Sequence, residues 1–165
     1  WSHIMIPHFP LIFGPNGEPI TPGQPLLAMN HPEYTDSGWD VKTQFIQQLQ
    51  FANKKSMELI NKILENEKQA IIIIQSDHGS AFDTNLQDPV DDDVFQRLSN
   101  LNAIYFPDEK HREMLTDDRT NVNTFRIVFN SYFGSDYEML EDRIYWGLSY
   151  KKPFWFKDVT SILLN

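Results

Sequence analysis

The stretch AIIIIQSDHG, residues 70–79, decides the fold of this 165-residue chain. Alternate side chains of a β-strand point to opposite faces, so the four consecutive isoleucines at 71–74 predict a strand covered on both faces. Burial of one isoleucine is worth about 1.5–3 kcal/mol, which favours a position deep in the core. We therefore expect an α/β fold with a central mixed or mostly parallel sheet flanked by helices.

Polar residues follow this predicted strand at once, and Asp77 and His78 are the ones suited to chemistry. Ligands of open α/β sheets bind beyond the carboxyl ends of the strands, and Gly79 permits a tight turn there. An aspartate oxygen and a neutral imidazole nitrogen suit Zn²⁺, Mn²⁺ and similar ions. The alternative is an aspartate that caps the turn beside a histidine that packs, and the dipeptide alone favours neither.

The remaining elements are predicted from periodicity and from glycine and proline positions. Residues 40–67 have apolar residues at helical intervals and predict a long helix that begins at Asp40, with its Gln, Asn, Lys and Glu residues facing solvent. Further predictions are strands at 3–6, 101–106, 144–148 and 154–159, the last two antiparallel, and a short helix at 94–98 after the acidic triplet 91–93. A helix is also predicted at 122–133, its heavily aromatic buried face marked by Val122, Phe125, Phe129 and Phe133 with Ile127, Val128 and Tyr132 beside them.

Composition limits the possible functions. The net charge is −9, from 23 acidic and 14 basic residues, and this balance argues against nucleic acid as a partner. Cysteine is absent, which excludes disulfides, thiolate zinc sites and cysteine nucleophiles. With 41% hydrophobic residues, the chain has globular composition, and we expect residues 1–165 to form a single α/β domain or part of one.

Two histidines near the N-terminus are candidates for contact with a ligand. His8 lies in Pro-His-Phe-Pro, where the prolines stiffen the backbone around it; the alternative is a packed loop in which His8 is incidental. His3 is a second candidate, although on a strand it would point into the core. The long loop at 14–38 has the composition of a binding loop or lid, while His111 is expected to be solvated.

Two motifs resemble those of the sulfatase-like branch of the alkaline phosphatase superfamily, which includes phosphoglycerol transferases. They are Ser76-Asp77-His78-Gly79 after an isoleucine-rich strand and a long helix, and His8-Phe9-Pro10 with Phe13 nearby. The resemblance implies an alkaline-phosphatase-like fold of which this chain is the C-terminal part. It also implies that Asp77 and His78 bind a divalent metal ion (Mn²⁺, Mg²⁺, Ca²⁺ or Zn²⁺) and that His8 faces the phosphate or sulfate of the substrate.

The function implied by the resemblance is that of a metal-dependent hydrolase, or of a phosphoryl or phosphoglycerol transferase, acting on a phosphate or sulfate ester. The nucleophile of that family lies in the earlier half of the domain, so this chain would be inactive without an N-terminal half. The alternative is a non-catalytic α/β module, either an isolated half-domain or a degenerate relative, that self-associates through exposed core surface. Relatives are commonly membrane-anchored, with the catalytic domain outside the cytoplasm.

Overall fold

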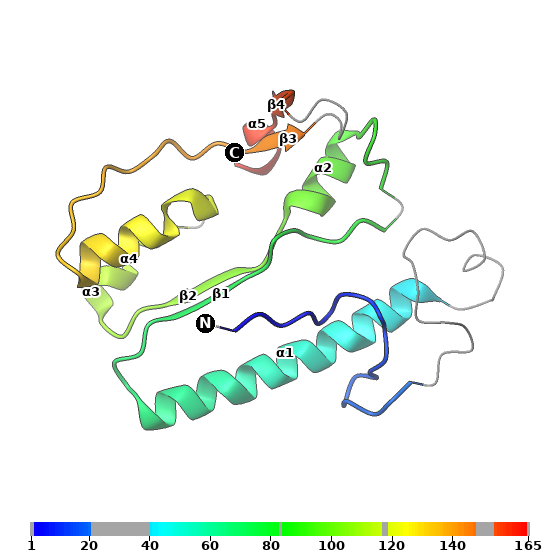
Figure 1. The fold of residues 1–165 in the computed structure, drawn as a ribbon, viewed down its shortest axis with the longest axis horizontal. Coiled ribbons are helices and arrows are strands. Elements are labelled where there is room, and N and C mark those ends of the chain that lie inside the picture. The colour runs from blue at the N-terminus through cyan, green and yellow to red at the C-terminus, as the bar shows by residue number, and fades with distance from the viewer. Residues whose placement is uncertain (1, 21–39, 83, 117–118, 148–153, 165) are drawn as a thin grey trace. The chain divides into compact units, whose positions relative to one another are not determined.

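The computed structural model describes residues 2–20, 40–82, 84–116, 119–147 and 154–164. Its contacts divide the chain into two compact units, Trp1–Glu67 and Lys68–Asn165, which we describe one at a time. The described residues form a mixed α/β structure of helices and two small antiparallel sheets (Figure 1). Most of the loop predicted at 14–38 lies outside the described residues.

The first unit is built on helix α1 (Val41–Asn66), which confirms the long helix predicted from periodicity (Figure 1). Asp40 is its N-cap, because the Asp40 side chain accepts a hydrogen bond from the amide of Thr43 at 3.0 Å. The helix ends where the amide of Glu67 donates to the carbonyl of Ile63.

Residues 2–20 are irregular, so the strand predicted at 3–6 is wrong. The amide of His8 donates instead to the carbonyl of Met5 at 2.7 Å, which closes a turn. Two X-Pro bonds, Ile6–Pro7 and Phe9–Pro10, are cis. Pro7 and Pro10 have no amide hydrogen to donate to a neighbouring strand, and this explains why β-like composition does not give a strand here.

In the second unit, β1 (Ile72–Gln75) pairs antiparallel with β2 (Asn102–Tyr105), which confirms both predicted strands. The isoleucines of β1 are half-buried instead of deeply buried, and no parallel pair occurs among the described strands. Ile71 and Ile73 pack against a core of buried side chains, whereas the sheet has only two strands. The faces of a strand are covered by elements that pack on the sheet, and of this isoleucine run Ile71 and Ile73 pack on the buried core, so the run is less buried than a strand covered on both faces.

One helix lies between these two strands and further helical segments follow them. The predicted helix after the acidic triplet is present as α2 (Asp91–Leu98), with the triplet in its first turn, where the helix dipole favours negative charge. A short helix, α3 (Glu109–Arg112), follows β2. The 3₁₀ turn η2 (Asn121–Asn123) leads into α4 (Thr124–Tyr132), and Gly134, with φ at +67°, follows the end of α4.

The aromatic stripe predicted to mark the buried face of α4 is exposed, whereas Ile127 and Val128, predicted beside it, are buried. Thr124, Ile127 and Val128 are buried, and the last two share a core with Phe106 and with isoleucines of β1 and β2. The residues of that stripe are at least 41% exposed, with Val122 at 41%, Phe125 at 56%, Phe129 at 41% and Phe133 at 67%. Apolar residues lie on both faces of this helix, so periodicity alone identifies two equally good candidates for the buried face.

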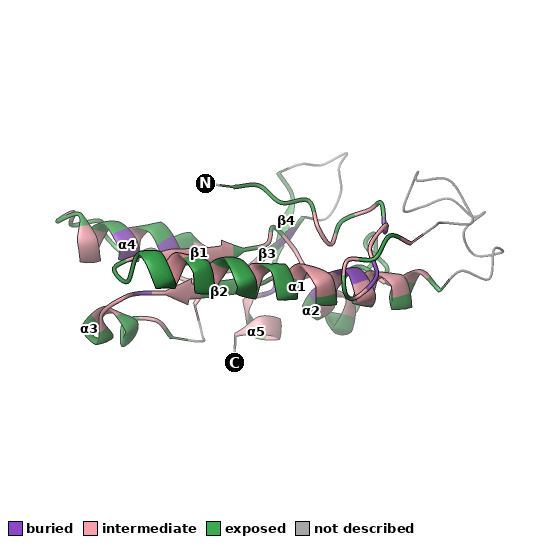
Figure 2. Cartoon of the chain, turned by 90° about the horizontal axis from the view of Figure 1, so that it is seen from below, coloured by how far each residue is buried: buried purple, intermediate pink, exposed green. Residues whose placement is uncertain are grey.

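The second core of this unit joins α2 to the C-terminal elements. β3 (Tyr145–Gly147) pairs antiparallel with β4 (Phe156–Asp158), as predicted, and α5 (Thr160–Leu163) follows. Val94, Trp146 and Val159 form the buried cluster between these elements, and Figure 2 shows how short the buried stretches are. Within the described part of the chain, no helix is both long enough and apolar enough to cross a bilayer.

Candidate functional site

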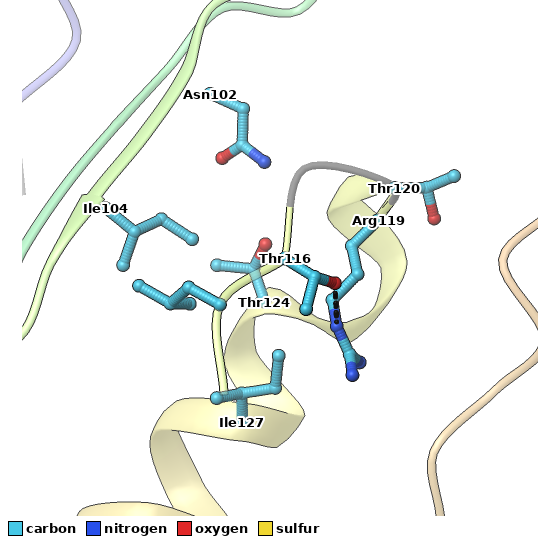
Figure 3. Close-up of a pocket in the computed structure, with 8 residues that line it drawn as sticks. Asn102, Ile104, Thr116, Arg119, Thr120, Thr124 and Ile127 are labelled. Atoms are coloured by element: carbon cyan, nitrogen blue, oxygen red, sulfur yellow. Dashed lines mark hydrogen bonds between the residues drawn. The ribbon is translucent and has the colours of Figure 1, made fainter. Parts of the chain in front are cut away.

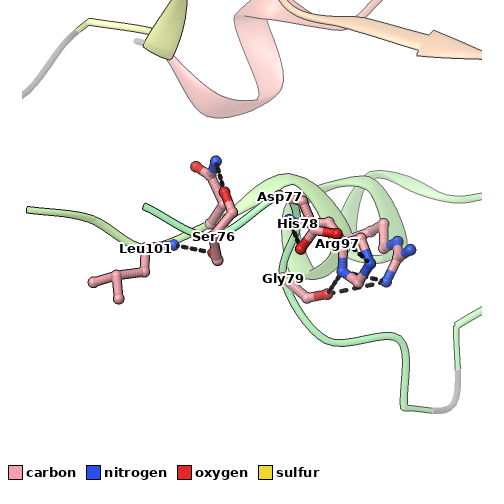
Figure 4. Close-up of polar contacts among 7 residues, drawn as sticks. Ser76, Asp77, His78, Gly79, Arg97 and Leu101 are labelled. Atoms are coloured by element: carbon pink, nitrogen blue, oxygen red, sulfur yellow. Dashed lines mark hydrogen bonds and ion pairs between the residues drawn. The ribbon is translucent and has the colours of Figure 1, made fainter. Parts of the chain in front are cut away.

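The turn that follows β1 is fixed at its first residue, Ser76 (Figure 4). The Ser76 amide donates to the carbonyl of Leu101 at 2.9 Å, and the Ser76 hydroxyl oxygen accepts from the Leu101 amide at 2.8 Å. The carbonyl of Ser76 accepts from the side-chain amide of Asn100 at 3.0 Å. These three bonds extend the pairing of β1 with the chain before β2 and hold the base of the turn.

Gly79 fixes the other end of the turn by packing against the C-terminal end of α2. Its amide donates to the carbonyl of Arg97 at 2.7 Å. A Cβ atom at this position would lie 2.3 Å from the carbonyl oxygen of Gln96 and 2.6 Å from that of Ser99. Gly79 is therefore required because backbone approaches it closely, which is a stronger reason than the tight turn expected from the sequence.

Asp77 and His78 lie between these two fixed points and project toward each other (Figure 4). Asp77 Oδ1 accepts from the His78 amide at 2.9 Å, and Asp77 Oδ2 lies 3.5 Å from His78 Nε2. Two donor atoms bound to one tetrahedral zinc ion, each about 2.0–2.2 Å from it, would be about 3.3–3.5 Å apart. The two side chains, 85% and 35% exposed, thus present an oxygen and a nitrogen at the spacing of metal ligands.

The contacts of His78 Nδ1 decide whether Nε2 is free to bind a metal ion. Nδ1 lies 2.8 Å from the carbonyl of Gly79 and 2.7 Å from Nη1 of Arg97, which also donates to that carbonyl at 3.1 Å. When Nδ1 donates to Gly79, Nε2 carries the lone pair, as in metal-binding histidines whose second nitrogen donates to a carbonyl. When Nδ1 accepts from Arg97, the proton is on Nε2 and faces Asp77.

Arg97 is the site residue that the sequence reasoning missed. It lies in the last turn of α2, where a basic residue is favoured by the helix dipole, and that is the only signal in the sequence. Its contact with His78 depends on the packing of α2 against the turn, across 18 residues of chain.

The Asp77–His78 pair provides part of a metal site. Among the described residues, no cluster of three or more His, Cys, Asp or Glu side chains could hold a metal ion. A catalytic zinc site takes three protein ligands and an open position. The pair therefore fits a divalent ion in donor type and spacing, and at least one further ligand must come from elsewhere.

The His8 loop in the first unit is organised by Gln48, a residue of α1 that is 0% exposed. Its Nε2 donates to the carbonyls of Pro7, His8 and Pro10, at 3.3, 3.0 and 3.3 Å. Its Oε1 accepts from the amides of Ile12 and Phe13, at 2.9 and 3.2 Å. The prediction that the glutamines of this helix face solvent is wrong at this position, because the irregular loop needs partners for its backbone.

His8 itself is exposed, with Nδ1 2.8 Å from the carbonyl of Phe9. This contact leaves Nε2 as the ring nitrogen that can meet a ligand. His3 is also exposed and lies in irregular chain, so the expectation that it points into the core of a strand is wrong. Of the predicted site residues, the structure brings Asp77 and His78 together in the second unit, while His3 and His8 belong to the first.

His111 is not solvated as predicted, because its side chain is only 20% exposed and packs on Tyr132, with ring centroids 4.7 Å apart. Its Nδ1 lies 2.7 Å from Asp108 Oδ1, at an angle outside the geometry of a straight hydrogen bond. The hydroxyl of Tyr132 donates to Asp108 Oδ2 at 2.5 Å. The Tyr132 hydrogen bond and the His111 contact hold the pKa of Asp108 below its ordinary value, and burial together with Asp108 raises the pKa of Tyr132.

A separate hollow of about 210 Å³ lies between β2 and the start of α4 (Figure 3). Its lining includes Arg119, held by the Thr116 hydroxyl at 3.0 Å. Gln75, the last residue of β1, donates to Asn102 and Thr124 in the same lining. Among the described residues that line this hollow, there is no carboxylate or imidazole.

Comparison with protein-family models, with curated proteins and with solved structures gives no match for this chain. The resemblance to sulfatase-like enzymes therefore rests on the two motifs alone, and what it implies is a matter for proposal.

Proposed function

We propose that this chain is the C-terminal part of a metal-dependent sulfatase-like hydrolase, or of a phosphoryl or phosphoglycerol transferase, that acts on a phosphate or sulfate ester. The observation that carries the proposal is the 3.5 Å separation of Asp77 Oδ2 and His78 Nε2 at the end of an isoleucine-rich strand. A carboxylate oxygen and an imidazole nitrogen at this spacing suit a shared divalent cation, such as Mn²⁺, Mg²⁺, Ca²⁺ or Zn²⁺.

The contacts that hold the turn favour a ligand site at Asp77 and His78 over an incidental contact between the two side chains. Ser76 and Gly79 fix the backbone on both sides of the pair, so the two side chains need little reordering to bind a cation. The Gly79 carbonyl beside Nδ1 favours the tautomer in which Nε2 can act as a ligand, while the Arg97 contact with the same nitrogen favours the other tautomer.

The residues have distinct roles in this proposal. A divalent cation at Asp77 and His78 would supply Lewis acidity that stabilises negative charge on the transferred group. His8 would donate a hydrogen bond to an ester oxygen or protonate the leaving group, a contribution typically of about 10²–10⁴-fold. The loop pinned by Gln48 holds the backbone of His8 in place for this role.

The proposal includes a partner and a larger fold. The third metal ligand and the nucleophile would come from an N-terminal half of the catalytic domain, and further strands beside β1 and β2 would complete an alkaline-phosphatase-like sheet. The open edges of the two-stranded β1–β2 sheet support this, because unpaired strand edges are the natural place for added strands.

Metal titration tests the first step. We expect the 165-residue chain to bind Zn²⁺ or Mn²⁺ weakly, and expect Asp77→Asn and His78→Gln each to lower the affinity at least about tenfold, because each removes one of the two donors. Asp88→Asn, which removes another exposed aspartate of the same unit, is the matched control and should leave the affinity unchanged. Calorimetric affinities that are the same in all four proteins would contradict the proposal.

The catalytic step is tested with the parent protein that contains this chain. Asp77→Asn should abolish turnover of a generic phosphodiester or aryl sulfate, whereas His8→Gln should lower kcat with little change in metal affinity. The chain alone should bind metal without turnover.

The alternative function is a non-catalytic module used for association, and the exposed face of α4 favours it. Phe125, Phe129 and Phe133 lie along one face, with neighbouring ring centroids 6.3 and 5.7 Å apart. Analytical ultracentrifugation distinguishes the two functions: reversible self-association that Phe129→Ser abolishes, without metal binding at Asp77, would support the association module.

A further inference from the structure

The hollow between β2 and the start of α4 is lined by a cation, Arg119 (Figure 3). The Arg119 side chain is half-buried, and its Nε donates to the Thr116 hydroxyl at 3.0 Å. Its Nη1 and Nη2 groups have no carboxylate partner within the described part of the chain, whereas Arg143 pairs with Glu141 and Asp158. A half-buried charge without a counter-charge is unfavourable, so an anion bound in the hollow would be stabilised by Arg119.

Gln75 determines which polar groups are free on the side of the hollow formed by β2 and α4. Its Nε2 donates to Oδ1 of Asn102 at 3.0 Å and to the hydroxyl oxygen of Thr124 at 3.1 Å. With these acceptors occupied, the side-chain N–H groups of Asn102 and the hydroxyl proton of Thr124 remain as donors. Thr124 is only 3% exposed, and no described residue accepts its hydroxyl proton. A buried donor without an acceptor is costly, which favours a ligand that supplies one.

The free hydrogen-bonding groups of the lining are therefore mainly donors. The Thr116 hydroxyl accepts from Arg119, so its proton is also available to a ligand. Figure 3 shows Asn102 on the β2 side of the hollow and Arg119 across from it. A ligand that lies between these groups needs acceptor atoms, and an anionic oxygen satisfies both the donors and the charge of Arg119.

Apolar side chains form the rest of the lining, and they indicate a ligand with a short hydrocarbon part. They belong to Ile104, Leu115 and Ile127, the last of which is 3% exposed. The hollow measures about 210 Å³. An engineered cavity of about 150 Å³ holds benzene, so a molecule of several carbon atoms fits here.

The surroundings of the hollow favour a ligand with a single negative charge. The Asp142 carboxylate lies close by, where it accepts from the amide and the hydroxyl of Thr120 at 2.8 and 2.7 Å. Asp117 and Asp118 precede Arg119 in the sequence, outside the described residues, and the chain has a net charge of −9. One guanidinium balances one negative charge, whereas the second charge of a phosphate ester would be repelled by this acidic protein. The two oxygens of a carboxylate also match the paired N–H groups of a guanidinium.

We propose that this hollow binds a small monocarboxylic acid, with the carboxylate on Arg119 and the hydrocarbon chain against the apolar lining. Asn102 and Thr124 donate to the remaining lone pairs of the carboxylate. The site does not rest on the proposed enzymatic function, because neither Asp77 nor His78 lines the hollow.

NMR titration of the 165-residue chain with butyrate tests the proposal, in the presence of a chelator so that no metal ion at Asp77 can take the carboxylate. We expect weak, saturable binding that shifts the amide signals of Thr116, Thr124 and Ile127 but leaves that of His78 unchanged. Butyramide, which has the same shape without the charge, should bind at least about tenfold more weakly. Propyl phosphate, whose phosphate carries a charge of about −1.5 to −2 at neutral pH, should also bind more weakly than butyrate.

Variants of the lining separate charge from geometry. Arg119→Gln should lower the affinity for butyrate at least about tenfold, because it removes a charge-assisted pair of hydrogen bonds. Arg119→Lys, which keeps the charge but not the paired N–H groups, should give a smaller loss. Thr124→Val should lower the affinity about threefold, because it removes one neutral donor.

Arg112→Gln is the matched control, because Arg112 is an exposed arginine of the same unit that does not line the hollow. It should leave the affinity for butyrate unchanged. Unfolding midpoints of the two Arg119 variants should match that of the unmodified chain, because Arg119 bonds to a single hydroxyl in the described structure.

Several results would overturn the proposal. Absence of saturable binding is one, and the same butyrate affinity in Arg119→Gln as in the unmodified chain is another. Equal affinities for butyrate and butyramide would mean that the hollow takes apolar molecules irrespective of charge. Tighter binding of propyl phosphate than of butyrate would assign the hollow to phosphate esters, and shifts confined to the surroundings of His78 would place the carboxylate elsewhere.

Discussion

The two histidine loops of this protein orient their rings in the same way but are held by different means. In both, Nδ1 lies 2.8 Å from the carbonyl of the next residue, Phe9 for His8 and Gly79 for His78. The His8 loop depends on one side chain, Gln48, which makes five hydrogen bonds to its backbone. The His78 turn is held at its base by Ser76 and Asn100, and at its other end by a close backbone approach that requires the absence of a side chain at Gly79. A loop can thus be fixed by a side chain that bonds to its backbone, or by the absence of a side chain that would prevent close backbone packing.

The largest effect is expected at Gly79. In Gly79→Ala, the new methyl group would lie 2.3 Å from a backbone oxygen that cannot move aside without unwinding α2. We expect the free energy of unfolding to fall by about 3 kcal/mol or more. Urea denaturation measures this loss, and metal binding at Asp77 should be lost with it.

Two other glycines provide graded controls for Gly79. Gly134→Ala should cost only about 1 kcal/mol, because φ is +67° there but no atom lies within 4 Å of the added methyl group. Gly147→Ala, whose nearest neighbour would be 4.0 Å away, should change stability by less than about 0.5 kcal/mol. Equal losses in all three variants would mean that close packing is not the reason for glycine at 79.

The next largest effect is expected at Gln48. Gln48→Ala leaves three carbonyls and two amides of the His8 loop without their partner, and we expect a loss of about 2–3 kcal/mol in the free energy of unfolding. Amide chemical shifts of Ile12 and Phe13 should change, while those around His78 should not. Gln50→Ala is the control, since Gln50 is exposed on the same helix. If both variants lose the same stability, Gln48 does not hold the loop.

A smaller effect is expected from Arg97, whose charge lies beside the His78 ring. Arg97→Gln should raise the affinity of the chain for Zn²⁺ about threefold, because it removes a partly screened positive charge near the ligands. Arg112→Gln, an exposed arginine of the same unit, should leave the affinity unchanged. A fall in affinity would show instead that Arg97, and not the turn backbone alone, positions the ring.

The smallest effect at neutral pH is expected for Tyr132→Phe. It changes the pair Asp108 and Tyr132, two titratable groups that contact His111. Asp108 has a pKa below its ordinary value of 3.8, so its contribution to stability is present above that pH and is lost as the pH falls through the folded-state pKa. Tyr132→Phe removes the hydrogen bond that contributes most. Stability below pH 4 should then depend less steeply on pH than in the unmodified chain, as measured by urea denaturation in acid. An unchanged acid limb would mean that Tyr132 does not stabilise the charged form of Asp108.

The positions of most helices and strands were predictable from the sequence. Which of their faces are buried was less predictable. The helix after Asp40, the isoleucine strand and the antiparallel pair of short strands were predicted because each depends on nearby residues. The buried face of α4 was predicted wrongly, because Phe129 and Ile127 are equally good core residues until a sheet covers one of them. The strand expected around His3 failed because Pro7 directs the chain into a turn.

The same dependence on nearby residues explains which parts of the site could be predicted. Asp77 and His78 are neighbours in the sequence, so their convergence needed only the turn between them. Gln48 and Arg97 act across 40 and 18 residues of chain, and no local pattern distinguishes them from solvent-exposed polar residues of a helix. Polar residues that bind the backbone of a distant loop follow no sequence periodicity, so a sequence pattern cannot identify them.

The segment that follows α4 is held mainly through its backbone, which constrains its length more than its side chains. Asn130 bonds to both backbone groups of Tyr137, at 2.8 Å each, and Arg126 donates to the carbonyl of Glu138. Asn123, which is 1% exposed, accepts from the amide of Leu140 and donates to its carbonyl. The exposed side chains at 138–140 can therefore be exchanged, as sites for a fluorophore or an affinity tag, whereas the ring of Tyr137 packs on Phe129. A single inserted residue would shift every one of these backbone contacts out of step.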